Sequence, residues 1–577
     1  MIDTAKRYDE ACSQFDARSY CRKLRDTREF GHAFIPMNHA KFLARSVSLH
    51  PNKEAVIDED LRYTYKELDQ QTNRFANALL NAGIEKYDRI AYLEGNTHEL
   101  LEGYLACPKI GTILLPMNIR LGLDDFEYML NDAIARVLIF DREFLTVIRK
   151  LIEKVPVERY IVTHSNEPVE IEGAVEATPY EVFLNKGSST PPPVDYLRDI
   201  DEADISELFY TSGTTGGLKG VMYTYREIYL HALEVIASWH IQQSDRVLHT
   251  VPLFHTNGWG TPQFLTAMGG THIMFRRFEP KRWLELVEKE KVTKSFMAPT
   301  MWGMVVDYVR AHPEEKYDLS SLDWGIAGGA AMSVGLCKDI EKVIGTEAIT
   351  SYGATETCPV VSQAHVKDAK GRYVLPEFAR LSEEELRLLR CRTGYPMVGV
   401  ETKIVDKDGT PVKFDATQVG TLYVRGNTVM RGYWRKPDKT KELIDDNGWF
   451  NIEDMCTLDQ YGYMLLVDRA KDIIISGGEN IASVEVERCI REHPAVAECV
   501  VVGKPDDKWG EIVHAVITLK QGAKATEKEI IEHCRDRLAH FKCPKSVDFV
   551  KELPKTATGK ILKRTIRDEL KGNPKAE

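Results

Sequence analysis

The feature that most constrains the fold is the alternation of short β-branched runs with helical patterns from about residue 60 onward. In one such unit, Thr64 and Glu67 have capping-box spacing, apolar residues recur on one helical face as far as Leu79, and Gly83 can end the helix. The next strand is expected over residues 89–93. Because this alternation is typical of helices packed on a sheet, we predict a large α/β domain.

The pattern changes after Asp472, where a compact α+β arrangement is predicted. We therefore expect a second, smaller domain at the C-terminal end. Its predicted elements are a helix near 483–492, strands near 496–502 and 512–519, and a helix near 528–538.

Composition is that of an ordinary globular protein, with 43% hydrophobic and 28% charged residues in a chain of 577. A net charge of −11 argues against a general nucleic-acid binder but leaves room for a local basic pocket that takes a phosphorylated ligand.

The eleven cysteines form no CxxC pair, so neither a disulfide framework nor a zinc ribbon is indicated. No secretory signal and no apolar run of about 20 residues is found, and we expect a cytoplasmic protein, with peripheral membrane contact left open.

The strongest local signal follows an apolar strand and runs from residue 210 to 220. It combines hydroxyls, flexible glycine backbone and one cation, which together suit a polyphosphate, because backbone N–H groups and hydroxyls donate while the ammonium neutralises charge. A glycine-rich surface turn would explain the glycines but not the hydroxyls and the lysine. The loop does not fit the Walker A pattern. The proposed ligands are Thr211, Ser212, Gly213, Thr214, Thr215 and Lys219.

A second cluster is Ser351, Tyr352 and Gly353 followed by Thr355 and Glu356. Here Tyr352 can cover an adenine face, Thr355 can donate to a phosphate, and Glu356 can hold Mg2+ against phosphate oxygens. The six residues from 351 to 356 prove little by themselves, and a polar turn is an equally good interpretation of them alone.

The two clusters are followed, in order, by residues 448–454, 468–472 with 476–479, and 554–561. This series resembles the adenylate-forming superfamily of acyl-CoA synthetases, luciferases and peptide-synthetase adenylation domains, over residues 35–570, and most closely its fatty-acyl-CoA ligases. The resemblance implies an N-terminal domain with several sheets and a small mobile C-terminal domain. Leu218 and Tyr225 depart from the usual proline and histidine, which leaves the local loop shape open. The implied division is 1–467 for ATP and acid binding, 468–472 for a hinge, and 473–577 for the mobile domain.

The resemblance also implies roles for single residues. Asp454 would accept both ribose hydroxyls, although an isolated aspartate is more often a turn or cap residue. Arg469 would lie near the ribose and phosphates, and Lys471 would be the hinge; a surface ion pair and a solvated lysine are the alternatives. Gly477, Gly478 and Glu479 would belong to the cofactor site near the pantetheine tunnel.

Lys560 is the residue we expect to be catalytic, since an ammonium between the substrate carboxylate and the α-phosphate would reduce the repulsion between the two anions. An exposed lysine loop is the alternative. With Thr355 and Glu356 it would form an acyl-adenylate from ATP, and CoA thiolate would then displace AMP. The expected cofactors are ATP, Mg2+ and CoA, with Glu356 and Thr211 as metal ligands.

Residues 251–259 closely resemble the acyl-pocket segment of aliphatic acid ligases. His255 and Trp259 are therefore predicted as pocket residues, with Trp259 as a gate, although ordinary core packing would suit Trp259 almost as well. Gly328, Gly329 and Ala330 resemble the adenine-side strand end, where small residues let a ligand approach the backbone. Chain length and branching of the acid are not readable.

The predicted function is thus an ATP-dependent carboxylic acid:CoA ligase acting on an aliphatic or fatty acid. The alternatives are an adenylating enzyme that delivers its acyl group to a carrier protein or another acceptor, an oxidative enzyme of the luciferase kind, and a non-catalytic nucleotide-binding scaffold. A scaffold would be expected to lack Glu356 or Lys560, and this sequence has both. Analogy with fatty-acid ligases suggests a homodimer.

Overall fold

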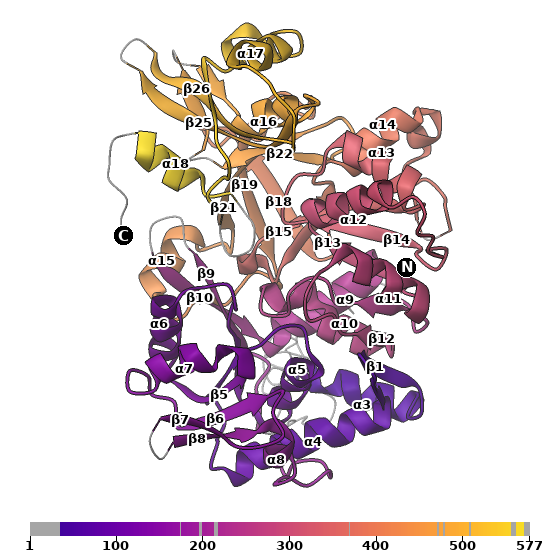
Figure 1. Cartoon of the computed structure of the whole chain (residues 1–577), viewed down its shortest axis with the longest axis vertical. Coiled ribbons are helices and arrows are strands. Elements are labelled where there is room, and N and C mark those ends of the chain that lie inside the picture. Colours follow the sequence, from indigo (N-terminus) through magenta and orange to yellow (C-terminus); the bar gives the residue numbers. More distant parts are fainter. Residues whose placement is uncertain are drawn as a thin grey trace, which may run out of the picture.

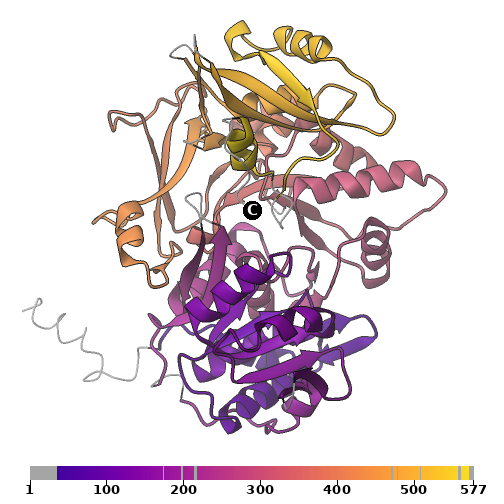
Figure 2. The ribbon, with the colours of Figure 1, turned by 60° about the vertical axis from the view of Figure 1, so that its left-hand side comes forward.

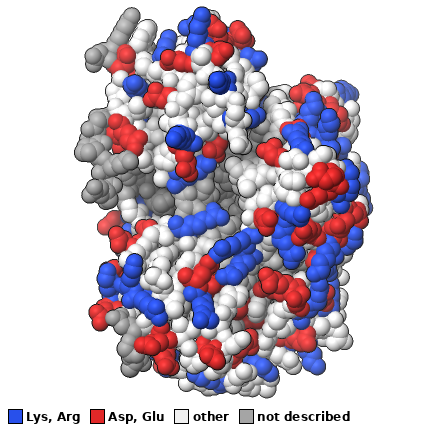
Figure 3. Space-filling view, viewed as in Figure 1, with Lys and Arg blue, Asp and Glu red and all other residues white. Residues whose placement is uncertain are grey.

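The computed structural model describes residues 35–172, 175–195, 199–212, 217–368, 370–469, 472–476, 479–506, 509–555 and 561–570. The elements that follow residue 472 gather at one end of the long axis, and α3 (Ala40–Leu49) and α4 (Tyr65–Asn81) lie at the other (Figure 1). Figure 2 shows the C-terminal sheet standing above the larger lobe. On the face in Figure 3, basic and acidic side chains are interspersed.

The larger lobe is built on two nine-stranded sheets, both mainly parallel in their centres. The first has the order β17 (Tyr395–Pro396), β16 (Val360–Gln363), β15 (Glu347–Gly353), β14 (Trp324–Gly328), β13 (Lys294–Met297), β11 (Arg246–Leu248), β12 (Thr271–Ile273), β1 (Glu54–Asp58) and β2 (Leu61–Thr64). The second has the order β20 (Gly432–Tyr433), β10 (Leu218–Thr224), β9 (Ile205–Ser212), β4 (Ile113–Pro116), β3 (Arg89–Leu93), β5 (Ala135–Asp141), β6 (Arg159–Thr163), β8 (Val175–Pro179) and β7 (Val169–Glu172).

Helices cover both faces of each sheet. In β3, Ile90 and Tyr92 pack into the core shared with α4, whereas Ala91 and Leu93 pack into a different core, as the two-residue period of a strand requires. The remaining helices of this lobe are α5 (His98–Ile110), α6 (Leu123–Ala133), α7 (Leu145–Leu151), α8 (Tyr180–Leu184), α9 (Tyr225–Ser238), α10 (Thr261–Met268), α11 (Pro280–Glu290), α12 (Pro299–Ala311), α13 (Val334–Val343), α14 (Glu383–Arg390) and α15 (Pro437–Leu443).

Two smaller sheets complete the fold. An antiparallel sheet has the order β18 (Val400–Val405), β19 (Gly420–Gly426), β21 (Phe450–Leu458) and β22 (Met464–Arg469). The C-terminal sheet has the order β24 (Glu479–Ile481), β23 (Ile474–Ser476), β26 (Gly510–Leu519) and β25 (Val496–Asp506), with β27 (Ser546–Phe549) beside β26. It is accompanied by α16 (Ser483–Arg491), α17 (Glu527–Arg535) and α18 (Lys563–Leu570).

The fold class predicted from the sequence is confirmed: a large α/β domain with several sheets and a smaller α+β domain. The local predictions also hold. Thr64 and Glu67 form the capping box of α4, and β3 spans Arg89–Leu93 as expected. The C-terminal strands are longer than predicted, because their antiparallel pairing continues to the Asp506–Gly510 pair. No helix in the described ranges combines the length and apolar character needed to cross a bilayer.

Candidate active site

The hairpin of β9 and β10 holds the first predicted cluster. Thr211 near the end of β9 pairs in register with Lys219 on β10. The Lys219 ammonium lies 5.2 Å from the centre of the Tyr433 ring, and the residue is only 9% exposed. Burial lowers the pKa of Lys219 and Lys439 lowers it further, whereas Glu356 raises it. The hairpin therefore presents a partly shielded cation close to a carboxylate.

Glu356 and Thr355 lie on the short 3-10 turn η3 (Thr355–Thr357) that follows β15. Tyr433 donates a hydrogen bond to Oε1 of Glu356 at 2.8 Å, and Tyr223 donates to the Thr355 carbonyl oxygen at 2.5 Å. Burial and the nearby Glu356 carboxylate raise the pKa of Tyr433, so its hydroxyl keeps the proton that it donates. Tyr433 thus links the two predicted clusters.

Tyr433 was not predicted from the sequence. It belongs to the two-residue strand β20, which pairs with β10. It lies 77 residues from its hydrogen-bond partner Glu356 along the chain. No local motif marks such a residue, and only the strand pairing could have revealed it.

Tyr352 and Asp454 form the next part of the site. The Tyr352 hydroxyl donates to Oδ2 of Asp454 at 2.5 Å. Asp454 is 7% exposed and lies inside β21, where its backbone pairs with Arg469, so it is neither a turn nor a cap residue. A carboxylate with two acceptor oxygens beside an aromatic ring can bind a ribose and its base.

The ends of β14 and β15 are adjacent, with Gly328 in register with Ser351. A Cβ atom on Gly328 would lie 2.6 Å from Cη2 of Trp259, so the indole approaches this strand as only a glycine allows. The following Gly329 and Ala330 are exposed. At Gly353, a Cβ atom would lie 1.8 Å from the Pro359 carbonyl oxygen.

The predicted pocket residue His255 directly precedes an unusual turn, and Trp259 lies within it. The 3-10 segment η2 (Thr256–Gly260) has left-handed backbone at Thr256, Asn257 and Trp259, with φ of 47°, 42° and 58°. His255 and Trp259 are both half-buried, and Trp259 also packs against the hydrophobic core that includes buried residues of α9 and α10. Both interpretations of Trp259, pocket wall and core packing, are therefore compatible with its contacts.

Several predicted residues lie outside the described residues. These are Gly213, Thr214, Thr215, Lys471, Gly477, Gly478 and Lys560. Ser212, Arg469 and Glu479 have described backbone but no described side chains.

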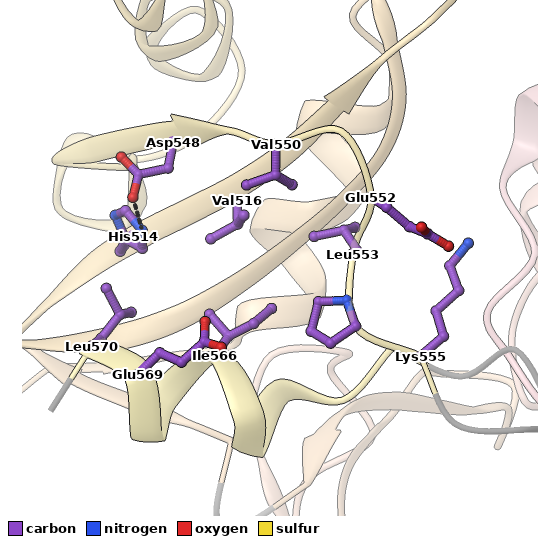
Figure 4. A pocket seen from close by; sticks show the side chains of 11 residues that line it. His514, Val516, Asp548, Val550, Glu552, Leu553, Lys555, Ile566, Glu569 and Leu570 are labelled. Carbon is purple, nitrogen blue, oxygen red and sulfur yellow. Dashed lines mark ion pairs between the residues drawn. The ribbon is translucent and has the colours of Figure 1, made fainter. Parts of the chain in front are cut away.

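The base of the loop that carries Lys560 is nevertheless defined. Lys555 and Ile561 form an antiparallel bridge, and the Leu562 amide donates to the Pro554 carbonyl at 2.8 Å. Lys555 also lines a pocket of about 580 Å3 between β26, β27 and α18, with His514, Asp548 and Ile566 (Figure 4). Except for the flanking lysine, this pocket lies apart from the predicted site.

The predicted magnesium ligands offer hard oxygen atoms. In the described part of the chain, no hydrogen bond reaches the second carboxylate oxygen of Glu356, and Thr211 adds a hydroxyl on the neighbouring hairpin. Such donors, completed by phosphate oxygens, suit Mg2+. Two other groups with metal-ligand spacing, Asp58–His98–Glu99 and Glu94–Asp141–His164, contain neither of these residues.

The chain matches the AMP-binding enzyme family over residues 43–434 and the AMP-binding enzyme C-terminal domain over residues 485–560. It is 33% identical over 543 residues to 4-hydroxybutyrate–CoA ligase 2 of Metallosphaera sedula, covering 93% of this chain and 95% of that protein. It is also 33% identical over 544 residues to a long-chain-fatty-acid–CoA ligase of Thermus thermophilus, covering 93% and 96%. The fold is similar to that of the anthranilate CoA ligase AuaEII, with a TM-score of 0.80, 26% identity and coverage of 93% of this chain and 98% of that one.

Proposed function

The chain belongs to the AMP-binding enzyme family, and we propose that it joins an aliphatic carboxylic acid to CoA. The protein is an AMP-forming acyl-CoA synthetase whose substrates are a carboxylic acid, ATP and CoA. The observation that carries the assignment of the site is that Tyr433 contacts both Lys219 and Glu356, and that Tyr352, four residues before Glu356, bonds Asp454.

In the first half-reaction, a carboxylate oxygen of the acid attacks the α-phosphorus of ATP, and the bond to pyrophosphate breaks. We assign Asp454 to the ribose hydroxyls, Tyr352 to the adenine, and Lys219 with Thr355 to the phosphates. Mg2+ held by Glu356 and Thr211 would neutralise phosphate charge. Hydrogen bonds already orient two of these carboxylates, since Tyr352 bonds Asp454 and Tyr433 bonds Glu356.

Lys560 is proposed to steady the carboxylate against the α-phosphate during that attack. In the second half-reaction, the CoA thiolate attacks the acyl carbonyl carbon and AMP leaves with the electron pair of the anhydride bond. We propose that residues 473–577 reorient about Lys471 between the steps, which would withdraw Lys560 and bring the Gly477–Gly478–Glu479 loop toward the pantetheine arm, with Arg469 near the phosphates.

The proposal of an aliphatic acid rests on the predicted acyl pocket. Residues 251–259 resemble the acyl-pocket segment of fatty-acyl ligases, and Trp259 touches the Gly328 strand end as a gate would. The names of the relatives divide between aliphatic acids, such as 4-hydroxybutyrate and long-chain fatty acids, and aromatic acids, such as benzoate and ferulate, and a structural neighbour is an anthranilate CoA ligase, so the names favour neither class. Transfer to a carrier protein or another acceptor is the second candidate. A cytoplasmic location, peripheral membrane contact and a homodimer remain predictions.

The test is a turnover assay with purified protein, ATP, CoA and a panel of straight-chain, branched, dicarboxylic and aromatic acids. AMP and pyrophosphate should appear only with an acid present, and CoA should be consumed in equal amount. Formation of ADP would refute the reaction, and preference for benzoate-type acids would refute the aliphatic assignment. In a second arm, Lys560→Ala should slow adenylation by about 10²–10³-fold and spare thioester formation from supplied acyl-AMP. Equal loss of both steps would exclude the role of Lys560.

A further inference from the structure

Glu207 is a buried acid with no place in the chemistry described above. It lies in β9, four residues before Thr211, and is only 1% exposed. Its carboxylate faces the segment that follows residue 255. Asn257 donates to Oε2 at 3.3 Å, and Gln263 in α10 donates to Oε1 at 2.7 Å. The Glu207 carboxyl group therefore links β9, which leads into the β9–β10 hairpin, to the turn that carries Trp259.

The turn requires an external restraint. Thr256, Asn257 and Trp259 all have left-handed backbone, which is unfavourable for threonine and tryptophan although asparagine tolerates it, so contacts with the surroundings help to hold the turn. The Thr261 hydroxyl holds the Gly258 carbonyl at 2.7 Å from the helix side. The bonds to Glu207 are the only side-chain hydrogen bonds that Asn257 and Gln263 make within the described ranges.

Trp259 follows Asn257 by two residues, and the position of its indole is therefore set by the same turn. That indole lies against Gly328. Gly328 pairs in register with Ser351, and the next residue, Tyr352, donates a hydrogen bond to Asp454. A substrate acid must approach this strand end, because its carboxylate has to reach the nucleotide. Any shift of the turn consequently changes the space beside the reacting carboxylate.

We propose that Glu207 is a positioning residue that holds the Thr256–Gly260 turn and thereby sets which acyl chains Trp259 admits. The inference rests on the proposed function. Burial raises the pKa of Glu207 to about 8, so the carboxyl is largely neutral at pH 7 and needs no buried cation. Its role is then one of hydrogen bonding rather than of charge.

The experiment compares Glu207→Leu, Glu207→Gln and the full-length wild type in pyrophosphate release with straight-chain acids from two to sixteen carbons. Leucine cannot bond either amide, so the KM for the preferred acid should rise at least 10-fold and the chain-length preference should flatten, with the KM for ATP changed less than two-fold. Glutamine can bond both partners after one amide flips, so it should retain the wild-type preference.

Two further variants sharpen the result. Asn257→Gly keeps the left-handed backbone but removes the amide, and it should reproduce the flattened preference even if Glu207→Leu fails to fold. Glu102→Gln is the matched control. Glu102 is a buried acid whose carboxylate accepts a hydrogen bond from the Tyr180 hydroxyl at 2.8 Å, and no hydrogen bond in the described ranges joins it to the Thr256–Gly260 turn. An unchanged chain-length profile in Asn257→Gly and in folded Glu207→Leu, or a parallel rise in KM for ATP and acid, would overturn the proposal. A wild type inactive with every acid would instead reject the proposed function itself.

Discussion

Tyr433 shows how one side chain can organise a site without any motif. Its ring lies against the Lys219 ammonium and its hydroxyl bonds Glu356, and in the described part of the chain no ion pair joins this lysine to this carboxylate. A direct ion pair would neutralise both groups and leave neither available to a phosphate or a metal. Tyr433 thus contacts both charged groups.

We predict that Tyr433→Phe lowers kcat/KM for ATP by about 10- to 100-fold, because a hydrogen bond to a charged group contributes about 1.5–3 kcal/mol. The ring beside Lys219 is kept, so binding of nucleotide without Mg2+ should change little. The measurement is pyrophosphate release at several Mg2+ concentrations. Tyr423→Phe is a suitable control, since that ring only packs beside Lys403 at 5.0 Å. Equal activity in both variants would exclude this role for the Tyr433 hydroxyl.

At the scale of elements, the parallel strands β14 and β15 bring two glycine-containing ends together. Carboxyl ends of neighbouring parallel strands share one edge of the sheet, where ligands of α/β proteins commonly bind. The aromatic side of the site thus depends on strand order as much as on residue type. Gly328 is the point at which this edge meets the Trp259 turn.

Gly328→Ala is expected to push the Trp259 indole away, because the new methyl would lie 2.6 Å from its ring. Because the strained turn restricts how far the indole can move, activity with the preferred acid should fall by about 10-fold or more. The free energy of unfolding should fall by about 1–3 kcal/mol. Activity assays and denaturant midpoints check both effects. Gly335→Ala in α13 has room for a methyl, with Ser333 Oγ 3.9 Å away, and should lower neither activity nor stability. Wild-type activity and stability in Gly328→Ala would show that the contact is unimportant.

At the scale of the whole molecule, Asp468 on β22 contacts residues of the smaller C-terminal domain. Its Oδ2 accepts a hydrogen bond from the Ser483 amide at 2.7 Å, and Oδ1 lies 3.9 Å from the Lys563 ammonium. Lys563 also pairs with Glu487 at 2.9 Å, and Arg567 pairs with Asp472 at 2.6 Å. The helix after the Lys560 loop is thereby tied to the proposed hinge.

Lys563→Ala should loosen this arrangement, because it removes one cation that two carboxylates share. Limited trypsin digestion near residue 471 should become about three-fold faster or more, with little change in the melting temperature of the larger lobe. Lys528→Ala removes an exposed lysine that pairs only weakly with Glu532 at 3.8 Å, and serves as the control. Unaltered digestion in Lys563→Ala would show that other contacts hold the domains.

Local chemistry explains which predictions could be made from the sequence. Some features depend only on neighbours within a few residues, so the sequence alone predicts them. These are the cap at Thr64, the β3 strand and the glycine- and hydroxyl-rich segments. The same is true of the α/β class, because alternating periodicities record which faces are to be buried. The roles of Lys560 and Lys471 remain predictions, since both residues lie outside the described ranges.

The sequence by itself determined the α/β class, the smaller C-terminal domain and most of the polar groups proposed to meet ATP. Only the tertiary structure decided which residues meet: Tyr352 bonds Asp454 across 102 residues, and Glu207, which no sequence motif singled out, bonds Asn257 across 50. The physical reason is that a hydrogen bond needs two atoms within about 3 Å, and strand order rather than local propensity brings distant residues that close.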